Sequence, residues 1–469
     1  SKYLYRMEEK ISIDVSRISN SLNQKKHLSQ LLKPYCINLE QLKDVTKRMA
    51  IAFEKGLEFE EKTYHYSPLK MLPTHLSHTP NGSEEGCFYA IDLGGTNLRF
   101  LKISIIDGIL IPESTSCTLS QSLMTGTGAA LFDFIADCIE DGFKKFGISG
   151  RTLAFLGFTF SFPVNQVALN EGSLVRWTKG YSATGVEGQD VVHLLKHACL
   201  RKQILIQEVI LINDTTGTLL NGAFEKPATK IGVVVGTGTN ACYIEKYKNL
   251  KKSKFIYNND NIIINTEWGS FGENGEMDEL RTSEDYQTDQ ESINPQKQTF
   301  EKMVSGMYLG EIARKIIISV SEHRYIFSNG IPVKFMVSGS FPSEMISLAH
   351  TKCEFIKNFT NSFEYLLKEE EFDIIFKICD TIARRSADLC AAGLAAILSR
   401  IECPEGIIAA DGSFFKKHPH YICYVSSCLK KIISGKRDFD ILLVEDGSGK
   451  GAALAACVAY SKNMNFSDH

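Results

Sequence analysis

The sequence has almost no net charge, because 52 lysine and arginine residues nearly balance 55 acidic residues and leave −3 at pH 7. A chain without a strongly basic surface does not attract nucleic acid or anionic lipid, so we expect neither as a partner. The 13 cysteines and 11 histidines show no CxxC, CxxH or HExxH spacing, which argues against the common zinc and dithiol motifs. We expect reduced thiols, mostly in the core, and hence a cytoplasmic protein.

Long apolar runs are also missing. No stretch of about 18 apolar residues occurs, and the opening SKYLYRMEEK contains no secretory core, so we expect no membrane anchor. The chain is long, with 469 residues of which 43% are hydrophobic. One hydrophobic core usually stops growing at about 250–300 residues. We therefore expect two domains. We also expect the protein to be a monomer or a homodimer.

Apolar residues recur at helical spacing in several long segments of the chain. Helices are predicted over 37–58, 130–147, 189–203, 299–318 and 381–400. Between them lie β-like runs such as CFYAIDL, NLRFLKISII and LAFLGFTFSFPV, and this alternation predicts an α/β architecture. The Pro- and Ser-rich segment 65–86 is predicted to be a crossing linker, and the polar tract 281–298 an exposed loop.

Two stretches share one plan, with an apolar strand, a turn ending in Gly-Thr-Asn, and a second strand. They are YAIDLGGTNLRFLKI at 89–103 and IGVVVGTGTNACYIEK at 231–246. Each predicts a β-hairpin, and the duplication indicates two related α/β halves facing one another across a cleft, unless the two turns agree by chance. Successive backbone N–H groups in a turn suit phosphate, so two such turns could bracket a polyphosphate.

Two nucleotide-binding motifs come close to matching and fail. GSGKG at 447–451 lacks the Walker A spacing, since Val444 and Gly451 stand where a glycine and a serine or threonine are required. GTGTNA at 236–241 matches the dinucleotide fingerprint. That fingerprint needs a following helix, whereas ACYIEKY alternates like a strand. We therefore do not expect a dinucleotide-dependent dehydrogenase.

Polar residues lie where two of the predicted strands end. Asn213 and Asp214 follow the apolar strand VILI, where a carboxylate is costly to desolvate unless something there needs it. Asp92 precedes a glycine turn, where it could hold hydrated Mg²⁺ near phosphates or simply fix its own turn. Arg99 lies two residues beyond that turn and suits phosphate oxygens, although an ordinary surface charge is the alternative.

Other polar residues, taken singly, fit a structural role at least as well as a ligand role. They are Ser161, Thr178, Lys179, Glu267 and Glu301. Glu267 lies in a glycine-rich loop, and Glu301 opens a predicted helix, whose N-terminus favours an acid in any case.

Taken together, these motifs carry more information than any one of them. In chain order they are DLGGTNLRF, FTFSFPV, RWTKGYSATGVEGQDV, LINDTTGTLLNGAF, VVVGTGTNACYIE, NTEWGSFG, FEKMVSGMYLGE, AADGSFFKKHPH and EDGSGKGAALAA. The series resembles the hexokinase family, the ATP-dependent hexose 6-kinases, and it follows the family's order over nearly the whole chain. The resemblance is to a single unit of the family, not to its tandem double form.

The resemblance implies an actin-like ATPase (ribonuclease H-like) fold, in which two α/β domains, each with a five-stranded mixed sheet, close over a central cleft. It implies a discontinuous large domain over 1–77 and 214–448 and a small domain over 78–213 and 449–469. In this arrangement the repeated hairpins contact the nucleotide phosphates from both sides.

The activity implied by the resemblance is transfer of the γ-phosphoryl group of Mg-ATP to the 6-hydroxyl of D-glucose and related hexoses, the first step of glycolysis. Asp214 matches the general base and forms the catalytic set with Lys179 and Arg99. The implied sugar-binding residues are Ser161, Phe162, Thr178, Lys179, Asn213, Asp214, Asn240, Glu267 and Glu301. The implied ATP-binding residues are Asp92, Gly94, Gly95, Thr96, Asn97, Arg99, Gly236, Thr237, Gly238, Gly412 and Ser413, with Asp92 near Mg²⁺ through water.

The segments 65–86, 281–298 and 338–345 depart from the family pattern, which affects the nucleotide side and regulation rather than the sugar site. Two alternative functions remain. A catalytically silent sugar sensor would have no need of Asp214 or Lys179. An actin-like or chaperone-like ATPase would share the hairpins but would not explain SFPV, WTKG and Glu267 together.

Overall fold

The structure is a computed structural model, and its contacts divide the chain into two compact units. It describes residues 23–58, 67–94, 97–149, 152, 154–177, 180–252, 260–401, 405–435 and 437–467. Unit 1 comprises Ser1–Thr46, Phe271–Gly393 and Lys417–Ile432, and Unit 2 comprises Lys47–Ser270, Leu394–Lys416 and Ile433–His469. The domain division predicted at 77/78, 213/214 and 448/449 stays a prediction.

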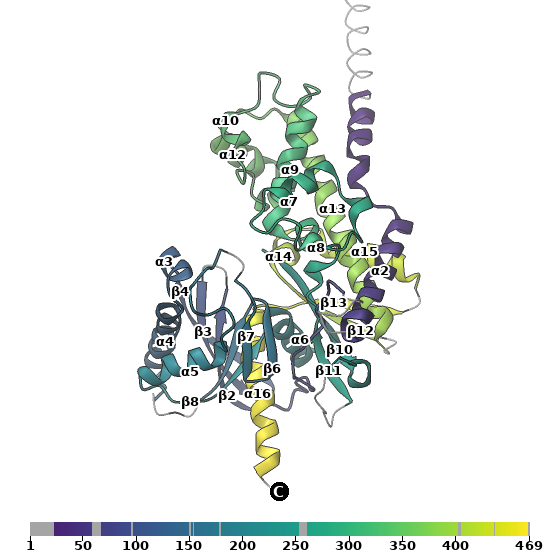
Figure 1. Ribbon diagram of the computed structural model, residues 1–469. Helices are drawn as coiled ribbons and strands as arrows, with labels where there is room; N and C mark the ends of the chain where they lie inside the picture. The colour runs from purple at the N-terminus through teal and green to yellow at the C-terminus, as the bar shows by residue number, and fades with distance from the viewer. Residues whose placement is uncertain are drawn as a thin grey trace, which may run out of the picture. The chain divides into compact units, whose positions relative to one another are not determined.

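Unit 2 contains a five-stranded mixed sheet in the order β4-β3-β2-β5-β8 (Figure 1). Its strands are β2 (Gly86–Leu93), β3 (Asn97–Ile106), β4 (Ile109–Thr118), β5 (Ala154–Phe160) and β8 (Ile206–Ile212). β2, β3 and β4 are antiparallel neighbours, whereas β5 and β8 run parallel to β2. The carboxyl ends of β2, β5 and β8 therefore lie along one edge of the sheet, where ligands bind in open α/β sheets.

Two helices cover one face of this sheet (Figure 1). They and the short elements near them are α3 (Gln121–Thr125), α4 (Gly128–Lys145), α5 (Val191–Arg201), β6 (Val164–Ala168) and β7 (Glu171–Leu174). α4 and α5 confirm the helices predicted over 130–147 and 189–203. Apolar side chains from both layers, among them Phe132, Phe158 and Leu195, form the core between them.

A second sheet of Unit 2 has six strands in the order β1-β11-β10-β9-β12-β13. They are β1 (Leu72–Pro73), β9 (Thr229–Val235), β10 (Thr239–Lys246), β11 (Asn261–Asn265), β12 (Glu405–Asp411) and β13 (Asp438–Leu443). β9 and β10 are antiparallel, as are β2 and β3, so both predicted hairpins are confirmed. The sheet has one strand more than expected because β1, from the predicted linker, pairs with β11.

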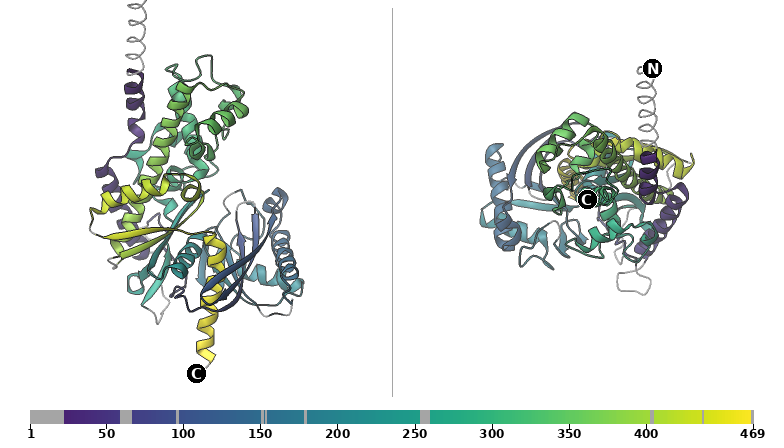
Figure 2. Two further views of the ribbon diagram at one scale, coloured as in Figure 1. Left: turned by 180° about the vertical axis from the view of Figure 1, so that it is seen from behind. Right: turned by 90° about the horizontal axis from the view of Figure 1, so that it is seen from above.

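Helix α16 (Gly447–Ser467) packs on the opposite face of the five-stranded sheet from α4 and α5, and also against α6 (Asp214–Glu225) (Figures 1 and 2). α6 in turn packs on β9, β10 and β12. The two helices approach closely, because a Cβ on Gly451 would lie only 2.0 Å from the Gly217 carbonyl oxygen. Only glycine permits this approach, which fixes α6 and therefore Asp214, its first residue.

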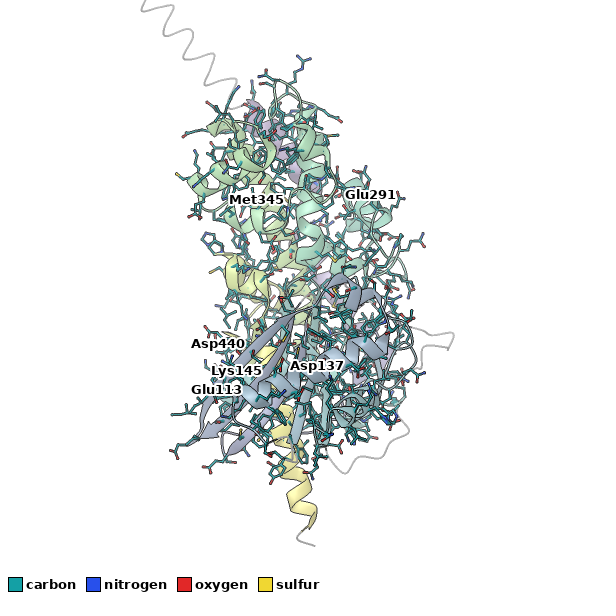
Figure 3. The ribbon with its side chains drawn as sticks, turned by 90° about the vertical axis from the view of Figure 1, so that its left-hand side faces the viewer. Glu113, Asp137, Lys145, Glu291, Met345 and Asp440 are labelled. Atoms are coloured by element: carbon teal, nitrogen blue, oxygen red, sulfur yellow. The ribbon has the colours of Figure 1, made fainter. Side chains whose placement is uncertain are left out.

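Ion pairs on the surface of Unit 2 are exposed. Lys102 of β3 pairs with Glu113 of β4 at 2.7 Å, and Lys202 pairs with Asp137 of α4. Figure 3 labels the two acidic residues, Glu113 and Asp137. The Glu113 and Asp137 side chains are 44% and 46% exposed, and such pairs contribute at most about 1 kcal/mol each. The stability of this unit therefore comes mainly from its buried apolar layers.

The described residues of Unit 1 form helices and no strand (Figure 1). They include η1 (Lys33–Tyr35), α2 (Leu39–Glu58), η4 (Asp278–Leu280), α7 (Ser283–Gln290), α8 (Thr299–Val304), α9 (Gly306–Ser321), α10 (Val333–Met336), α11 (Glu344–Leu348), α12 (Lys352–Phe363), α13 (Glu369–Arg400) and α15 (Tyr421–Ile433). α2 and α13, whose C-terminal parts belong to Unit 2, confirm the helices predicted over 37–58 and 381–400. Of the helices described anywhere in the chain, none is long and apolar enough to cross a membrane.

Two sequence-based predictions for Unit 1 were wrong. The tract 281–298, predicted to be an exposed loop, contains α7, on which Asp285 and Asp289 are buried. These two carboxylates accept hydrogen bonds from the buried cations Arg385 and Lys302. The polar composition of the tract does not reveal these partners. The segment 299–318, predicted as one helix, is divided into α8 and α9, because Ser305 adopts an extended backbone.

A buried ion pair anchors α7 within Unit 1. Both terminal nitrogens of Arg385 donate to the two carboxylate oxygens of Asp285, at 2.8 and 2.7 Å, and the two side chains are 0% and 2% exposed. Asp285 also caps its own helix by accepting from the Thr282 N–H. Such a bidentate pair holds α7 against α13, which carries Arg385.

Three histidines of Unit 1 gather next to Asp380 and Arg384. The Nε2 atoms of His350 and His418 are 3.2 Å apart, and the ring of His420 lies 4.9 Å from that of His350. Burial, followed by the charges of His350 and His420, lowers the pKa of His418 to about 4, and burial also lowers the pKa of His350. Both side chains are therefore held neutral in the folded protein near neutral pH.

We expect acid to destabilise the protein through His418. Between an unfolded pKa of about 6.5 and the folded value near 4, only the unfolded chain takes up the proton. Stability should therefore fall as pH falls through this window, by up to about 1.4 kcal/mol per pH unit. Urea unfolding at several pH values measures the slope. His418→Asn should reduce the slope of stability against pH, whereas His193→Asn, at an exposed position, should leave it unchanged. Equal slopes in the parent and in both variants would contradict the expectation.

Candidate active site

The sequence Asn213-Asp214 lies at the junction of β8 and α6. Asn213 caps the helix, because its Oδ1 accepts hydrogen bonds from the N–H and the hydroxyl of Thr215 at 2.9 and 2.8 Å. The Asp214 carboxylate also accepts from the Thr215 N–H at 2.9 Å. A helix N-terminus favours a carboxylate in this position, and Asp214 lies directly after the carboxyl end of a buried strand.

Ser161 and Phe162 follow the end of β5, the strand next to β8 in the sheet. The ring of Phe162 is 4% exposed and packs edge-on against Trp177 and Tyr181, with centroids 4.9 and 5.0 Å away. β5 therefore ends just before Ser161, and the aromatic cluster holds Phe162 next to Trp177.

Asn240 of β10 and Asn265 of β11 form a polar set with Glu267. The Asn240 amide donates to Asn265 Oδ1 at 2.7 Å and to Glu267 Oε1 at 3.3 Å, and Asn265 donates to the same Oε1 at 2.8 Å. Glu267 has a left-handed backbone with φ of +53°, which a non-glycine residue adopts only at a cost that the surroundings must cover. Among the described residues, no group donates a hydrogen bond to the second oxygen, Oε2.

A small cavity in Unit 2 joins these groups. Its polar lining includes Asn213 after β8 and Asn265 at the end of β11, and Phe162 forms part of its apolar wall. Asn265 donates to Glu267, and Asn213 precedes Asp214, so each candidate carboxylate neighbours one residue of the lining. The cavity has a volume of about 20 Å³, which has room for about one water molecule.

A charged cluster lies at the end of β2. Arg99 of β3 donates to Asp92, and to Asp446 at 2.6 Å, and Ser448 donates to Asp92 at 2.9 Å. Burial lowers the pKa of Arg99, but Asp92 and Asp446 more than offset it, so the pKa stands above its usual value. Burial raises the pKa of Asp446, while Arg99 opposes the rise. The cluster places two carboxylates and one guanidinium at the N-terminus of α16.

Two glycine turns complete this side of the unit. In the first, the Gly94 N–H donates to the Asn97 carbonyl at 3.0 Å, which closes the turn between β2 and β3. In the second, between β9 and β10, a Cβ on Gly236 would lie 3.7 Å from the Cα of Gly412. The second turn therefore lies next to the segment that leads from β12 into α14 (Ser413–Lys417).

Comparison with known proteins shows which protein family the chain belongs to. Two hexokinase family models match the chain, one over residues 27–224 and the other over 230–458. The structure matches a hexokinase from Schistosoma mansoni complexed with glucose, with a TM-score of 0.85 and 36% identity, covering 93% of this chain and 99% of that one. The chain belongs to the hexokinase family. It has the actin-like ATPase fold of two α/β domains that the family resemblance implied.

Other hexokinases agree with this assignment. A further solved hexokinase has a TM-score of 0.80 and 28% identity, covering 93% of this chain and 99% of that chain. Hexokinase-2 of Equus caballus is 40% identical over 441 residues, and Hexokinase-3 of Rattus norvegicus is 39% identical over 442 residues. These matches cover 91% and 92% of this chain but 47% of each relative. The chain therefore spans about half the length of the curated hexokinases that it matches.

Unit 2 contains many of the residues that the hexokinase resemblance implied. The described members within Unit 2 are Asp92, Gly94, Asn97, Arg99, Ser161, Phe162, Asn213, Asp214, Gly236, Thr237, Gly238, Asn240, Glu267, Gly412 and Ser413. Gly95, Thr96, Thr178 and Lys179 lie outside the described residues. Glu301 is the third residue of α8, in Unit 1. The ligand roles of all these residues stay predictions.

Residue-by-residue reading of the hexokinase motifs missed three side chains. Asn265 connects Asn240 to Glu267, and Asp446 and Ser448 contact the Arg99 and Asp92 pair. Asn265 belongs to the motif NTEWGSFG, and Asp446 and Ser448 belong to EDGSGKG. Both motifs are part of the hexokinase resemblance, but these three residues were not among the predicted site residues. No sequence pattern showed that β11 lies beside β10 or that the start of α16 meets β2 and β3.

Proposed function

We propose that this chain transfers the γ-phosphoryl group of Mg-ATP to the 6-hydroxyl of D-glucose and related hexoses, with Asp214 as general base. The observation that carries the proposal is the capped Asn213-Asp214 junction in a chain whose structure matches a glucose-bound hexokinase over 99% of that protein. Phosphoryl transfer requires mainly positioning and electrostatic stabilisation from the protein. A carboxylate fixed at a strand end supplies the first of these.

Asp214 supports the role of base by its position. It is the first residue of α6, and this helix packs closely on α16 where Gly217 meets Gly451. A general base must lie within hydrogen-bond reach of the hydroxyl proton that it accepts. Asp214 follows Asn213 at the carboxyl end of β8, which is where ligands bind in open α/β sheets.

Sugar recognition is proposed to rest on amide and carboxylate groups. Glu267 Oε1 is already used by Asn240 and Asn265, which orients Oε2 toward a further donor such as a sugar hydroxyl. Buried polar groups left unpaired by a sugar that lacks a hydroxyl cost about 1–3 kcal/mol. Hexoses that lack a bound hydroxyl are therefore expected to bind more weakly. Ser161, Thr178, Lys179 and Glu301 are proposed to complete the sugar contacts.

Glu267→Gln is expected to raise the KM for glucose by roughly tenfold or more, since a hydrogen bond to a charged group is worth about 1.5–3 kcal/mol. The KM for ATP should change little, because Glu267 belongs to the sugar side. Initial-rate kinetics with each substrate varied in turn measure both values. Glu113→Gln, on the exposed edge of the other sheet, is the matched control. A glucose KM equal to that of the control would remove Glu267 from the sugar site.

ATP is proposed to bind at the two glycine turns, with Gly95, Thr96, Asn97 and Thr237 near its phosphates and Gly412 and Ser413 near its adenosine. The Arg99 guanidinium forms ion pairs with Asp92 and Asp446. It could bind phosphate oxygens if these displaced one of the two carboxylates. Asp92 and Asp446 offer the carboxylate oxygens that suit Mg²⁺, which commonly keeps several waters. When bound, the ion would neutralise charge on the transferring phosphates.

Product assays with several sugars test the proposal. Glucose, mannose and fructose are each incubated with Mg-ATP, and sugar phosphate and free phosphate are both measured. We expect sugar phosphate with glucose and little ATP hydrolysis without sugar, because water is a competing nucleophile that a closed site excludes. ATP hydrolysis at the same rate with and without sugar would contradict the proposal. Glucose binding without any product would instead favour a sugar sensor.

A further inference from the structure

One carboxylate in Unit 2 joins two places that the proposed function assigns to different parts of ATP. Asp411 is the last residue of β12, and the two residues after it, Gly412 and Ser413, form the adenosine segment. Asp411 Oδ1 accepts from the Gly412 N–H, and Oδ2 accepts from the N–H of Gly447 at 2.9 Å, 36 residues further along the chain. The residue is 8% exposed. Asp411 therefore ties the end of β12 to the start of α16.

The start of α16 carries groups that are proposed to meet the phosphates and Mg²⁺. Asp446, the residue before the helix, pairs with Arg99 at 2.6 Å, and Ser448 donates to Asp92 at 2.9 Å. These four residues are the phosphate-side cluster. Asp446 has a left-handed backbone with φ of +55°, which a non-glycine residue adopts only where its surroundings hold it. The cluster therefore depends on what holds the peptide group that follows Asp446.

The Asp411 carboxylate holds this peptide group directly. The Gly447 N–H opens α16, where backbone donors lack partners within the helix, and it lies in one plane with the Asp446 carbonyl. The hydrogen bond from this N–H therefore restricts rotation of the peptide group away from its observed orientation. The contact is close, because a Cβ on Gly447 would lie 2.9 Å from Asp411 Oδ2 and 2.8 Å from Thr218 Oγ1. A larger residue at position 447 would push the carboxylate away.

The carboxylate itself is attached to a rigid strand end. Asp411 pairs with Val234 of β9 in the six-stranded sheet. A Cβ on Gly412, whose φ is +106°, would lie 2.3 Å from the Val235 carbonyl oxygen, so this position requires glycine. Lys416 of α14 also forms an ion pair with the Asp411 carboxylate. The orientation of Asp411 is therefore set by its own strand, and α16 is held relative to that strand.

We propose that Asp411 is a positioning residue for ATP, because its carboxylate fixes the spacing between the adenosine segment and the phosphate-side cluster. A nucleotide that binds at both places acts as two linked ligands, and it binds tightly only where the two subsites are already at the matching distance. Loss of the hydrogen bond to α16 would leave both subsites present but free to shift relative to one another. This inference rests on the proposed function, since it takes both places to belong to the ATP site.

Asp411→Asn tests the inference, because asparagine has nearly the same size but only one acceptor oxygen. One of the two N–H groups then loses its acceptor. The probe is the magnesium complex of adenylyl imidodiphosphate, whose Kd is measured by calorimetry at saturating glucose. We expect this Kd to rise roughly tenfold or more, as for the loss of a hydrogen bond to a charged group. The Kd for glucose should stay close to that of the parent, whereas a general structural role would move both values.

Gly447→Ala is a second variant, because its methyl group displaces the carboxylate from the N–H without removing any charge. It should raise the analogue Kd in the same way, and it decides the matter if Asp411→Asn does not fold. Asp190→Asn is the matched control, since Asp190 Oδ1 accepts from the N–H groups of Gly172 and Val192 at 3.1 and 3.0 Å at the start of α5.

An unchanged analogue Kd in the folded variants would overturn the inference, as would an equal rise in the Asp190 control. A fall in melting temperature with both Kd values unchanged would also overturn it, because Asp411 would then serve stability alone. The assay needs binding and not turnover, so it separates this inference from the proposed function. A parent protein that binds glucose and the analogue but makes no sugar phosphate would refute the function and leave the Kd comparison valid.

Discussion

Substitution of Asp214 by asparagine is expected to lower kcat for glucose phosphorylation by roughly 10²–10⁴-fold, the usual contribution of a positioned general acid or base. Asparagine has nearly the same size and keeps an oxygen that can accept from the Thr215 N–H, as the carboxylate does. The start of α6 should therefore remain intact. The amide cannot accept the proton of the attacking hydroxyl, so the chemical step should slow while glucose still binds.

Steady-state kinetics and glucose calorimetry on the same preparation check this prediction. Asp440→Asn is the matched control, because Asp440, which is labelled in Figure 3, is an exposed residue of β13 in the same unit. Its carboxylate pairs with Lys226 at the surface. The control should keep the parent kcat, and calorimetry should show that the Asp214 variant still binds glucose. An Asp214 variant with unchanged kcat would exclude this residue as the base.

Replacement of Arg385 by methionine is expected to lower the free energy of unfolding by about 3–5 kcal/mol, the usual cost of removing one partner from a buried ion pair. The change leaves the Asp285 carboxylate without either of its two guanidinium bonds. It also fills much of the space of the lost side chain, so the loss reflects the unpaired charge more than a cavity. Urea unfolding monitored by circular dichroism measures the difference.

The double variant Asp285→Asn with Arg385→Met should recover part of this loss, because it removes the unpaired charge as well. Lys334→Met is the exposed control, since its pair with Glu364 has side chains that are 56% and 73% exposed. Such a surface pair contributes about 1 kcal/mol at most. If the Arg385 and Lys334 variants lost the same stability, the buried pair would not be the anchor of α7.

The sequence was most informative where strands end. Strand β8 is an unbroken apolar run followed at once by Asn213 and Asp214, and this boundary is where the structure places the helix cap. The two hairpins could be predicted because glycine turns between β-like runs have few other conformations. These features are local, so a single sequence contains them in full.

The sequence was least informative where a side chain depends on a distant partner. Nothing near Asp285 in the chain indicates that Arg385, 100 residues away, neutralises it, so the polar tract was predicted to be an exposed loop. Asn265 was missed for a similar reason, because its role follows from the pairing of β11 with β10. The position of Asp446 beside Arg99 likewise depends on where α16 packs.

The most direct test of the central claim is the position of the phosphate on the product. The protein is incubated with glucose and Mg-ATP, and the product is examined by ³¹P and ¹³C NMR. The account predicts that ATP and glucose are consumed together and that phosphorus is coupled to carbon 6 of the sugar, in glucose 6-phosphate. Phosphate on carbon 1, or free phosphate released without a sugar ester, would contradict transfer to the 6-hydroxyl.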